Sequence, residues 1–218
     1  MSQKLIAAVA RSARLRVLNA LKRTQGLSVQ ELADLLGMSY MGIKDLCSDL
    51  EGRRLVKGRR EPRPEGNSGR PRILYRLTEH AHGLFPVASN PFTLEVFEAT
   101  KKLFGPAAPD KLLMLVWQQK AADMESRVKG GGPAERAASL AKVRDREGHM
   151  AGVERGSDGK LRIVEHHCPF LDVLRAYPVI AKLETELFSR LIGVPVERRE
   201  EDPAGLYRAE FAVGANED

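Results

Sequence analysis

Hydrophobic and polar positions recur at helical spacing from the start of the first third of the chain. In residues 11–24, Leu15, Leu18 and Leu21 fall at the intervals that place side chains on one helix face. Ser12 stands in front of them as a candidate N-cap, because its short hydroxyl side chain can accept from a free backbone N–H. The pattern predicts an amphipathic helix.

Two further helices follow, separated by a glycine. Ser28 precedes the apolar-periodic stretch VQELADLLG, and Glu31 lies three residues later, as in a capping box. Gly37 ends this stretch, where the turn requires a positive φ. Ser39 then opens a third helix, which extends to about Arg54. Two short helices joined by a tight glycine turn predict a helix-turn-helix unit.

Residues 53–76 read RRLVKGRREPRPEGNSGRPRILYR and contain two short apolar runs, at Leu55-Val56 and at Ile73-Leu74-Tyr75. Each run is typical of a short strand. The loop between them is rich in Gly, Pro, Arg and Glu and can bury little. The whole segment carries nine Lys and Arg residues against two acidic ones. We therefore predict a β-hairpin wing with a basic tip.

The remaining chain changes pattern twice. A helix begins at Asn90-Pro91, and a longer apolar helix begins at Lys111. The stretch KGGGPAE at 129–135 marks a boundary, and the last third reads as β, β, α, β, β, with Pro178 kinking or dividing its helix. We predict an α+β protein with a winged helix-turn-helix at 1–87, a helical connector at 88–130, and a small α+β domain at 131–218.

The helix that begins at Lys111 is apolar over too wide an arc for a lone surface helix. Trp117 adds an aromatic residue of the kind enriched at protein interfaces. Burial in the core of the monomer and burial in a dimer interface both explain this pattern. A DNA-binding function favours the dimer, because a two-fold protein fits a pseudo-palindromic site.

The charge is concentrated in the first part of the chain. Residues 1–86 carry 16 Lys and Arg against 8 Asp and Glu, whereas residues 87–218 carry 19 against 21. This distribution indicates an anionic partner for the first part, with nucleic acid favoured over a membrane surface. No apolar run approaches the ~20 residues that span a bilayer. Two cysteines are too few for a disulfide scaffold, so we expect a reducing, cytoplasmic location.

Residues 10–86 resemble a winged helix-turn-helix DNA-binding domain of the ArsR/DeoR type, and GRPRILYRLTEHAHGLFP is similar to the wing and following helix of that family. The resemblance implies a recognition helix in the major groove of double-stranded DNA and a wing against the backbone or minor groove. The implied base-reading residues are Ser39, Tyr40, Met41 and Lys44, and the implied phosphate or minor-groove contacts are Arg59, Arg60, Arg63, Arg70 and Arg72.

The stretch EHHCPF, residues 165–170, is the candidate for metal chemistry. Strand alternation would place His166 and Cys168 on one face, with His167 on the other. His149, on the neighbouring predicted strand, is a candidate third ligand. Structural zinc takes four ligands and commonly uses closely spaced cysteine pairs, which this chain lacks. The spacing alone therefore gives a weak indication of a zinc or iron site.

Residues 131–218 resemble the C-terminal domain of the repressors that sense iron–sulfur clusters and control Suf assembly operons. The resemblance rests on GHMAGVE, LRIVEHHCPF and YPVIAKLETELFSRLIGVPVER. In that family several cysteines hold the cluster, and Cys168 matches the first of them. Ala181 stands where a later cysteine would follow the proline, and EDPAGLYRAEF supplies none. We therefore expect the scaffold without the cluster, with His166 and Cys168 as partly buried strand residues; zinc or iron at His149, His166 and Cys168 is the alternative.

These observations favour a homodimeric transcriptional repressor that is not an enzyme. Its C-terminal domain would respond to a small effector or metal, or would serve only to dimerise. An enzyme with Cys168 as nucleophile is one alternative, but no third catalytic group is recognisable in the sequence. A non-specific architectural nucleic-acid-binding protein is the other alternative. Such a protein would show a steep salt dependence with little preference between sequences.

Overall fold

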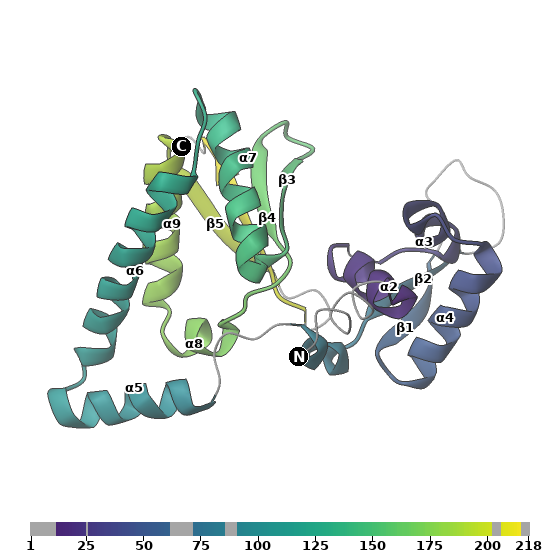
Figure 1. The fold of residues 1–218 in the computed structure, drawn as a ribbon, viewed down its shortest axis with the longest axis horizontal. Helices are drawn as coiled ribbons and strands as arrows, with labels where there is room; N and C mark the ends of the chain where they lie inside the picture. The colour runs from purple at the N-terminus through teal and green to yellow at the C-terminus, as the bar shows by residue number, and fades with distance from the viewer. Residues whose placement is uncertain (1–11, 25, 62–71, 86–90, 202–205, 215–218) are drawn as a thin grey trace. The chain divides into compact units, whose positions relative to one another are not determined.

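The computed structural model describes residues 12–24, 26–61, 72–85, 91–201 and 206–214. The chain forms two units, of which the first ends at Phe85 and the second runs from helix α5 to strand β6 (Figure 1). The sequence predicted 88–130 as a separate connector, but its described residues 91–130 belong to the second unit. Its residues Leu113, Trp117 and Met124 are part of that unit's hydrophobic core.

The first unit combines three helices with a hairpin. Its elements are α2 (Ala13–Lys22), α3 (Val29–Leu36), α4 (Tyr40–Gly52), β1 (Val56–Glu61), β2 (Arg72–Leu77) and the 3₁₀ helix η1 (Glu79–Leu84). The two strands pair antiparallel, from Val56 opposite Leu77 to Glu61 opposite Arg72. The tip of the predicted wing, 62–71, lies outside the described residues.

Local capping explains where the helices of the first unit begin and end. The Ser28 hydroxyl accepts from the backbone N–H of Glu31 at 3.2 Å, and the Glu31 carboxylate accepts from the backbone N–H of Ser28 at 2.7 Å, so the predicted capping box is confirmed. Gly37 ends α3 with φ 64°, also as predicted. Ser12 stands at the N-cap of α2, but its side chain makes no capping hydrogen bond.

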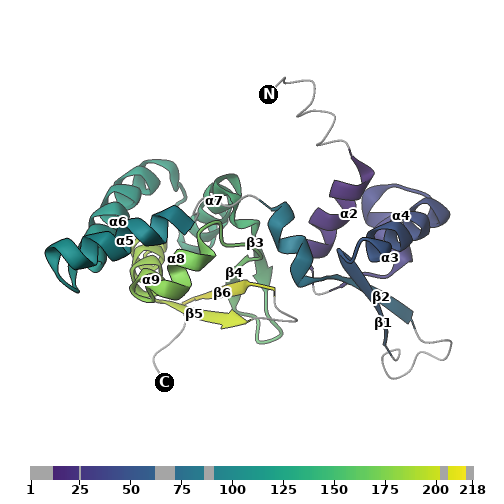
Figure 2. The ribbon, with the colours of Figure 1, turned by 90° about the horizontal axis from the view of Figure 1, so that it is seen from below.

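The core of the first unit lies between the three helices and the hairpin (Figure 2). A short bridge from Leu27 to Tyr75 joins the loop before α3 to β2. Cys47 is fully buried and packs as a small residue of this core. Apolar side chains of this core that are 0–1% exposed include Val17, Leu21, Leu32, Ile43 and Leu50.

The second unit is a four-stranded antiparallel sheet with helices on one face. Its elements are α5 (Pro91–Phe104), α6 (Ala108–Arg127), α7 (Pro133–Arg144), a π-helical turn η2 (Asp145–His149), β3 (Ala151–Arg155), β4 (Leu161–Glu165), α8 (Leu171–Ala176), α9 (Val179–Ile192), β5 (Val196–Glu201) and β6 (Arg208–Val213). The strand order is β3-β4-β6-β5. The predicted β, β, α, β, β pattern is confirmed, with Pro178 dividing the helix into α8 and α9.

Helices α7 and α9 pack on the sheet, and α6 packs on both of them (Figures 1 and 2). Phe188 of α9 and Phe211 of β6 are fully buried, with ring centroids 4.5 Å apart. Trp117 is buried within the unit, edge-to-face with Phe170, so the core explanation holds for this residue. Among the described residues, no helix combines the length and apolar character needed to cross a membrane.

Candidate nucleic-acid interface and buried polar network

The start of α4 presents exposed side chains on a capped helix. The Ser39 hydroxyl accepts from the backbone N–H of Gly42 at 3.2 Å, which fixes the first turn. Its own hydroxyl hydrogen remains able to donate. Tyr40 and Met41 are 50% and 58% exposed, and Lys44 is exposed one turn later. All four residues implied by the first resemblance as base-reading thus lie at the surface of the same two turns.

The opposite face of α4 fixes this presentation. Ile43, Cys47 and Leu50 are buried at successive intervals of three or four residues. Burial of the Cys47 thiol raises its pKa to about 11, with a further contribution from Glu51, so the group is neutral at physiological pH. The helix is therefore held by its apolar side and exposes its polar side at the N-terminal end.

The hairpin carries exposed positive charge that could contact the DNA backbone. Arg59 and Arg60 of β1 are exposed, whereas Arg63 and Arg70 lie outside the described residues. Lys57, which the sequence analysis did not single out, lies on the same strand, and a shallow groove beside it is also lined by Arg59 and His80. Strand alternation could have identified Lys57 from the sequence, because positions 57 and 59 lie on the same face of a strand.

Arg72 has a different environment from the other wing arginines. Its Nη1 donates to Glu31 Oε1 at 3.2 Å, so β2 is tied to the start of α3. Hydrogen bonds from Ser28, with the charge of Arg72, keep the pKa of Glu31 below its usual value. Arg72 lies opposite Glu61 at the tip end of the described hairpin, so its ion pair with Glu31 ties that end to α3. The described phosphate-facing candidates are therefore Arg59 and Arg60.

Acidic residues lie on the later turns of α4. Asp49 is held between Arg14 at 2.7 Å and Arg53 at 3.1 Å, and these hydrogen bonds lower its pKa. Asp45 is exposed. Asp49 therefore lies more than one turn beyond the base-reading candidates, whereas Asp45 directly follows Lys44.

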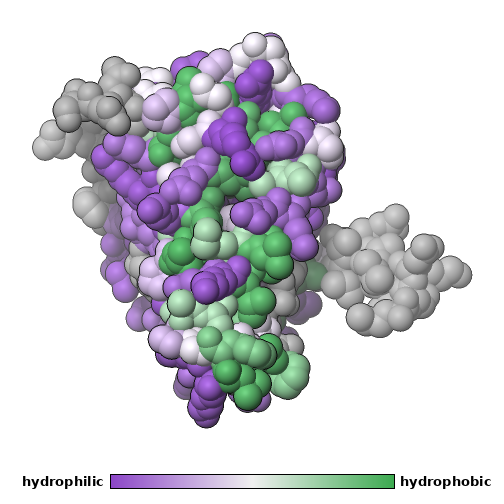
Figure 3. Space-filling view, turned by 90° about the vertical axis from the view of Figure 1, so that its left-hand side faces the viewer, coloured by the Kyte–Doolittle hydropathy of each residue, from purple (hydrophilic) through white to green (hydrophobic). Residues whose placement is uncertain are grey.

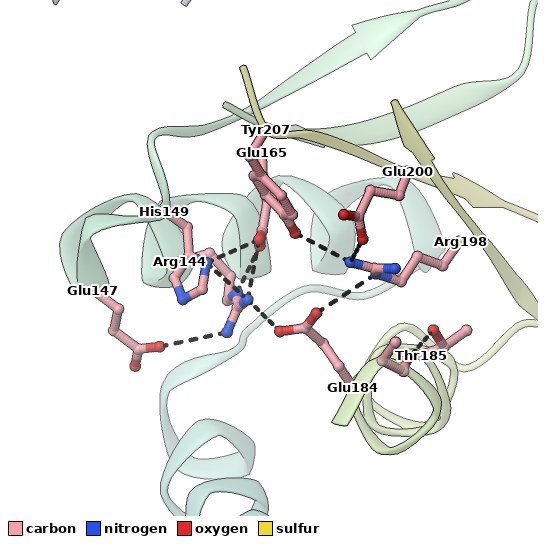
Figure 4. A network of polar contacts seen from close by, with 10 residues as sticks. Arg144, Glu147, His149, Glu165, Glu184, Thr185, Arg198, Glu200 and Tyr207 are labelled. Carbon is pink, nitrogen blue, oxygen red and sulfur yellow. Dashed lines mark hydrogen bonds and ion pairs between the residues drawn. The ribbon is translucent and has the colours of Figure 1, made fainter. Parts of the chain in front are cut away.

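The second unit contains a buried network of charged side chains (Figure 4). Arg144, at the end of α7, is 2% exposed; it donates to both oxygens of Glu165 on β4, at 2.6 and 3.0 Å, and also to Glu184 on α9. Both carboxylates are almost fully buried. One guanidinium therefore joins a helix end, a strand and a second helix through charge-assisted hydrogen bonds.

The two carboxylates have opposite pKa shifts. Burial raises the pKa of each, but the charges of Arg144 and His149 outweigh burial at Glu165, so the pKa of Glu165 is lowered. Burial dominates at Glu184, and its pKa is raised. The difference follows the geometry, because Arg144 gives Glu165 two hydrogen bonds and Glu184 one.

The network continues to the far strands of the sheet. Arg198 on β5 donates to Glu200 at 2.7 Å and to the Tyr207 hydroxyl at 3.2 Å, and its Nε lies 3.9 Å from Glu184. The same guanidinium stands 5.8 Å from the ring centroid of Phe211. A second cation therefore faces Glu184 from the side opposite Arg144 (Figure 4).

The three predicted metal ligands make other contacts: His149 and His166 face charged side chains, and Cys168 lies in the hydrophobic core. His149 Nδ1 lies 2.9 Å from Glu165 and 3.0 Å from Arg144, so this nitrogen is committed to the polar network. His166 Nε2 is 4.0 Å from Glu154. Over the described parts of the chain, no group of three or more His, Cys, Asp or Glu side chains could hold a metal ion.

The strand alternation expected for EHHCPF does not reach Cys168. Strand β4 ends at Glu165, and the Cys168 carbonyl accepts from Leu171 N–H in the turn that leads into α8. Cys168 is buried in the core, and burial raises its thiol pKa, so the thiolate needed of a nucleophile is disfavoured. EHHCPF is a strand end followed by a turn.

Comparisons with known proteins give little further information. No protein-family model matches the chain, and no curated protein matches it. One solved structure to which it is similar is a MarR/EmrR family transcriptional regulator from Acinetobacter sp. ADP1, at 22% sequence identity and a TM-score of 0.28. That match covers 51% of this chain and 75% of the other. At this TM-score the likeness supports no functional inference, so the chain's own residues carry the interpretation.

Proposed function

We propose that this protein is a sequence-specific DNA-binding transcriptional regulator. The observation that carries the proposal is the exposed N-terminal end of α4, with Tyr40 and Met41 at the surface, in the same unit as the exposed Arg59 and Arg60. A helix of this kind enters the major groove, where its first residues meet base edges. The hairpin arginines then meet the sugar–phosphate backbone.

Each side chain has a chemical role in this proposal. Tyr40 and Met41 make apolar contact with thymine methyl groups, whereas Ser39 and Lys44 donate hydrogen bonds to base acceptors. Arg59 and Arg60 neutralise phosphates and so contribute affinity that falls with salt concentration. Base contacts give sequence preference, and phosphate contacts position the protein.

We further propose that the regulator is a homodimeric repressor whose second unit responds to a ligand. A two-fold assembly would pair two copies of α4 with the two halves of a pseudo-palindromic operator. Bound there, the dimer would block access to the promoter. The excess of positive charge in the first 86 residues supports a division of labour in which that part binds DNA and the second unit regulates it.

Selection from a random duplex library, followed by fluorescence anisotropy at several salt concentrations, tests the proposal. The expected result is one enriched motif bound about 10³-fold or more tightly than unrelated duplex. Replacing Tyr40 and Met41 with alanine should reduce that ratio. Arg59→Glu should weaken binding to all duplexes and reduce the salt slope.

Arg155→Glu is the matched control, because Arg155 is also an exposed arginine on a hairpin strand but belongs to the second unit. It should leave both affinity and salt slope unchanged. Equal binding of all duplexes would contradict sequence-specific regulation and would indicate a non-specific nucleic-acid-binding protein instead. No binding to any duplex would refute a DNA-binding function.

A further inference from the structure

The second unit leaves a broad apolar surface uncovered on α5 and α6 (Figure 3). No residue of α5 is fully buried, and only Leu94 and Phe97 of this helix pack against the core. Large exposed apolar patches on soluble proteins commonly mark interaction sites. The exposed large apolar side chains of the two helices are Phe92, Val96, Leu103, Phe104, Leu112, Met114, Leu115 and Val116.

The end of α5 projects two large apolar side chains. Leu103 is 75% exposed and Phe104 is 76% exposed, and they are the last two residues of the helix. Lys101 and Lys102 directly precede them and are also exposed. Gly105, with φ 89°, then turns the chain toward α6. We call residues 101–104 the α5 tip; it is an apolar knob with two adjacent cations.

A groove lies between α6 and α9 in the same unit. Its apolar lining comes from both helices and includes Met114, Trp117, Leu183 and Leu187. We call it the α6–α9 groove. Unlike the α5 tip, it is concave, so the same unit carries an apolar projection and an apolar recess.

The rim of the α6–α9 groove is charged. Glu125 and Glu186 line it together with Arg190, which gives the rim one more negative than positive charge. Glu125 pairs with Arg190 at 3.2 Å, and both side chains are more than half exposed. Exposed pairs of this kind contribute little free energy, so they can be exchanged for pairs with another molecule.

We propose that a second copy of this chain covers this surface, with the α5 tip of each copy seated in the α6–α9 groove of the other. This proposal rests on the proposed function, because it assigns the interface of the homodimer proposed there. Charge complementarity supports it, because Lys101 and Lys102 of the tip would approach the glutamates of the rim. Apolar Leu103 and Phe104 would enter the apolar lining. A two-fold interface makes both contacts twice, which closes the assembly.

The length of α6 fits this arrangement. In an antiparallel pair of α6 helices with the two-fold axis near Leu115, Ala108 of one copy lies opposite residue 122 of the other. Each is about 10 Å from the axis, at 1.5 Å per residue. The α5 tip precedes Ala108 and so extends toward Glu125 of the second copy. The exposed Leu115 and Val116 lie at the centre of such a pair.

Light scattering coupled to size-exclusion chromatography, on the full chain at tens of micromolar, tests the interface. The wild-type protein should have twice the chain mass of 24.1 kDa. Leu103→Glu combined with Phe104→Glu should give the monomer mass. Leu35→Glu is the control, because Leu35 is a 62% exposed leucine on α3 of the first unit, and this variant should remain dimeric.

Charge reversal tests the pairing itself. Lys101→Glu with Lys102→Glu should raise the dimer dissociation constant about tenfold or more. Adding Glu125→Lys and Glu186→Lys to that variant should bring the constant back toward the wild-type value. A mutual rescue would not arise from general loss of folding.

Two results would overturn the interface: a monomeric wild-type protein, or a dimer that persists in the Leu103 and Phe104 double variant. The duplex selection described above separates this failure from failure of the proposed function. A wild-type monomer that still selects a DNA motif would overturn the interface and the proposed homodimer, but would leave sequence-specific DNA binding standing. A dimer with the expected variant behaviour that selects no DNA would overturn the regulator and leave the interface standing.

Discussion

Replacing Arg144 with methionine removes the cation that two buried carboxylates share. Glu165 is fully buried and Glu184 is 2% exposed, and Arg144 donates to both. Without it the ionised Glu165 would stay in the core with its charge uncompensated except by His149. Breaking a buried pair by removing one partner costs about 3–5 kcal/mol. A domain stability of about 5–15 kcal/mol would be reduced by a large fraction.

The single tryptophan makes the assay specific to the second unit. Trp117 is the chain's only tryptophan and is buried in that unit's core. Its fluorescence during urea unfolding should therefore report the second unit, whatever the first unit does. Arg146→Met is the matched control, because Arg146 is an exposed arginine two residues away, and its effect should stay within about 0.5 kcal/mol.

The pH dependence gives the destabilisation a second signature. In Arg144→Met both carboxylates lose their main counter-charge, so burial would raise the pKa of each above the ordinary value of 4.5. The folded variant then binds more protons than the unfolded chain above pH 4.5, and its stability falls as the pH rises through that window. The loss relative to wild type should be smaller near pH 5 than near pH 8.

A rescue separates loss of charge compensation from loss of packing. Adding Glu165→Gln and Glu184→Gln to Arg144→Met removes the buried negative charges and should recover part of the lost stability. A loss below about 1 kcal/mol in Arg144→Met, or a loss independent of pH, would refute the reasoning. It would mean that water or neighbouring groups compensate the two carboxylates.

Three further predictions follow from the local chemistry. Ser28→Ala should lower the free energy of unfolding of the first unit by about 1 kcal/mol, measured by amide hydrogen exchange, because the capping box is lost; an unchanged value would contradict this. Cys47 and Cys168 should both resist a disulfide-exchange reagent at neutral pH in the native protein and react after denaturation, because burial raises both thiol pKa values. Fast labelling of either native thiol would count against it. The lowered pKa of Glu165 contributes stability above pH 4.5 that is lost as the pH falls through the folded-state value, so Glu165→Gln should flatten the acid limb of a stability-against-pH curve; an unchanged acid limb would show that Glu165 does not contribute to it.

Local signals in the sequence were sufficient to predict most elements. The Ser28 and Glu31 pair defines the start of α3, and Gly37 defines its end, because each acts through hydrogen bonds or φ within one turn. The hairpin β3–β4 follows from two strand patterns around GSDG. Signals of this kind need no knowledge of distant residues, and they are therefore readable from the chain alone.

The polar network was not predicted, because its contacts join residues 21 and 40 positions apart. Charged side chains in a sequence are normally taken for surface residues. The hydrophobic periodicity nevertheless indicated that both carboxylates are buried. Glu165 lies two residues after the buried Ile163, on the same strand face, and Glu184 lies four residues after the buried Ile180. A carboxylate on each of two core-facing patterns indicates a buried cation elsewhere, and Arg144, four residues after the buried Leu140, is on such a face.

The metal hypothesis at EHHCPF assumed that strand geometry continued through Cys168. Alternation holds only while a residue pairs in a sheet, and β4 ends at Glu165. Beyond it Pro169 and the turn into α8 set the directions of the side chains. The position of a strand's last residue decides such an assignment, and sequence patterns locate element ends less reliably than their centres.

The proposed DNA contacts and the proposed dimer interface lie in different units, so their contributions separate experimentally. A change at Tyr40 or Met41 leaves the second unit's association unaltered and changes the preferred bases in both half-sites alike, because a two-fold dimer presents the same residue twice. A change at Phe104 leaves the base preference of each copy unaltered. It instead removes the gain in affinity that arises when one bound copy holds the other close to the second half-site, because that gain requires the two copies to be joined. Loss of affinity with monomer mass and unchanged base preference would therefore point to the dimer interface. Changed base preference with unchanged dimer mass would point to α4.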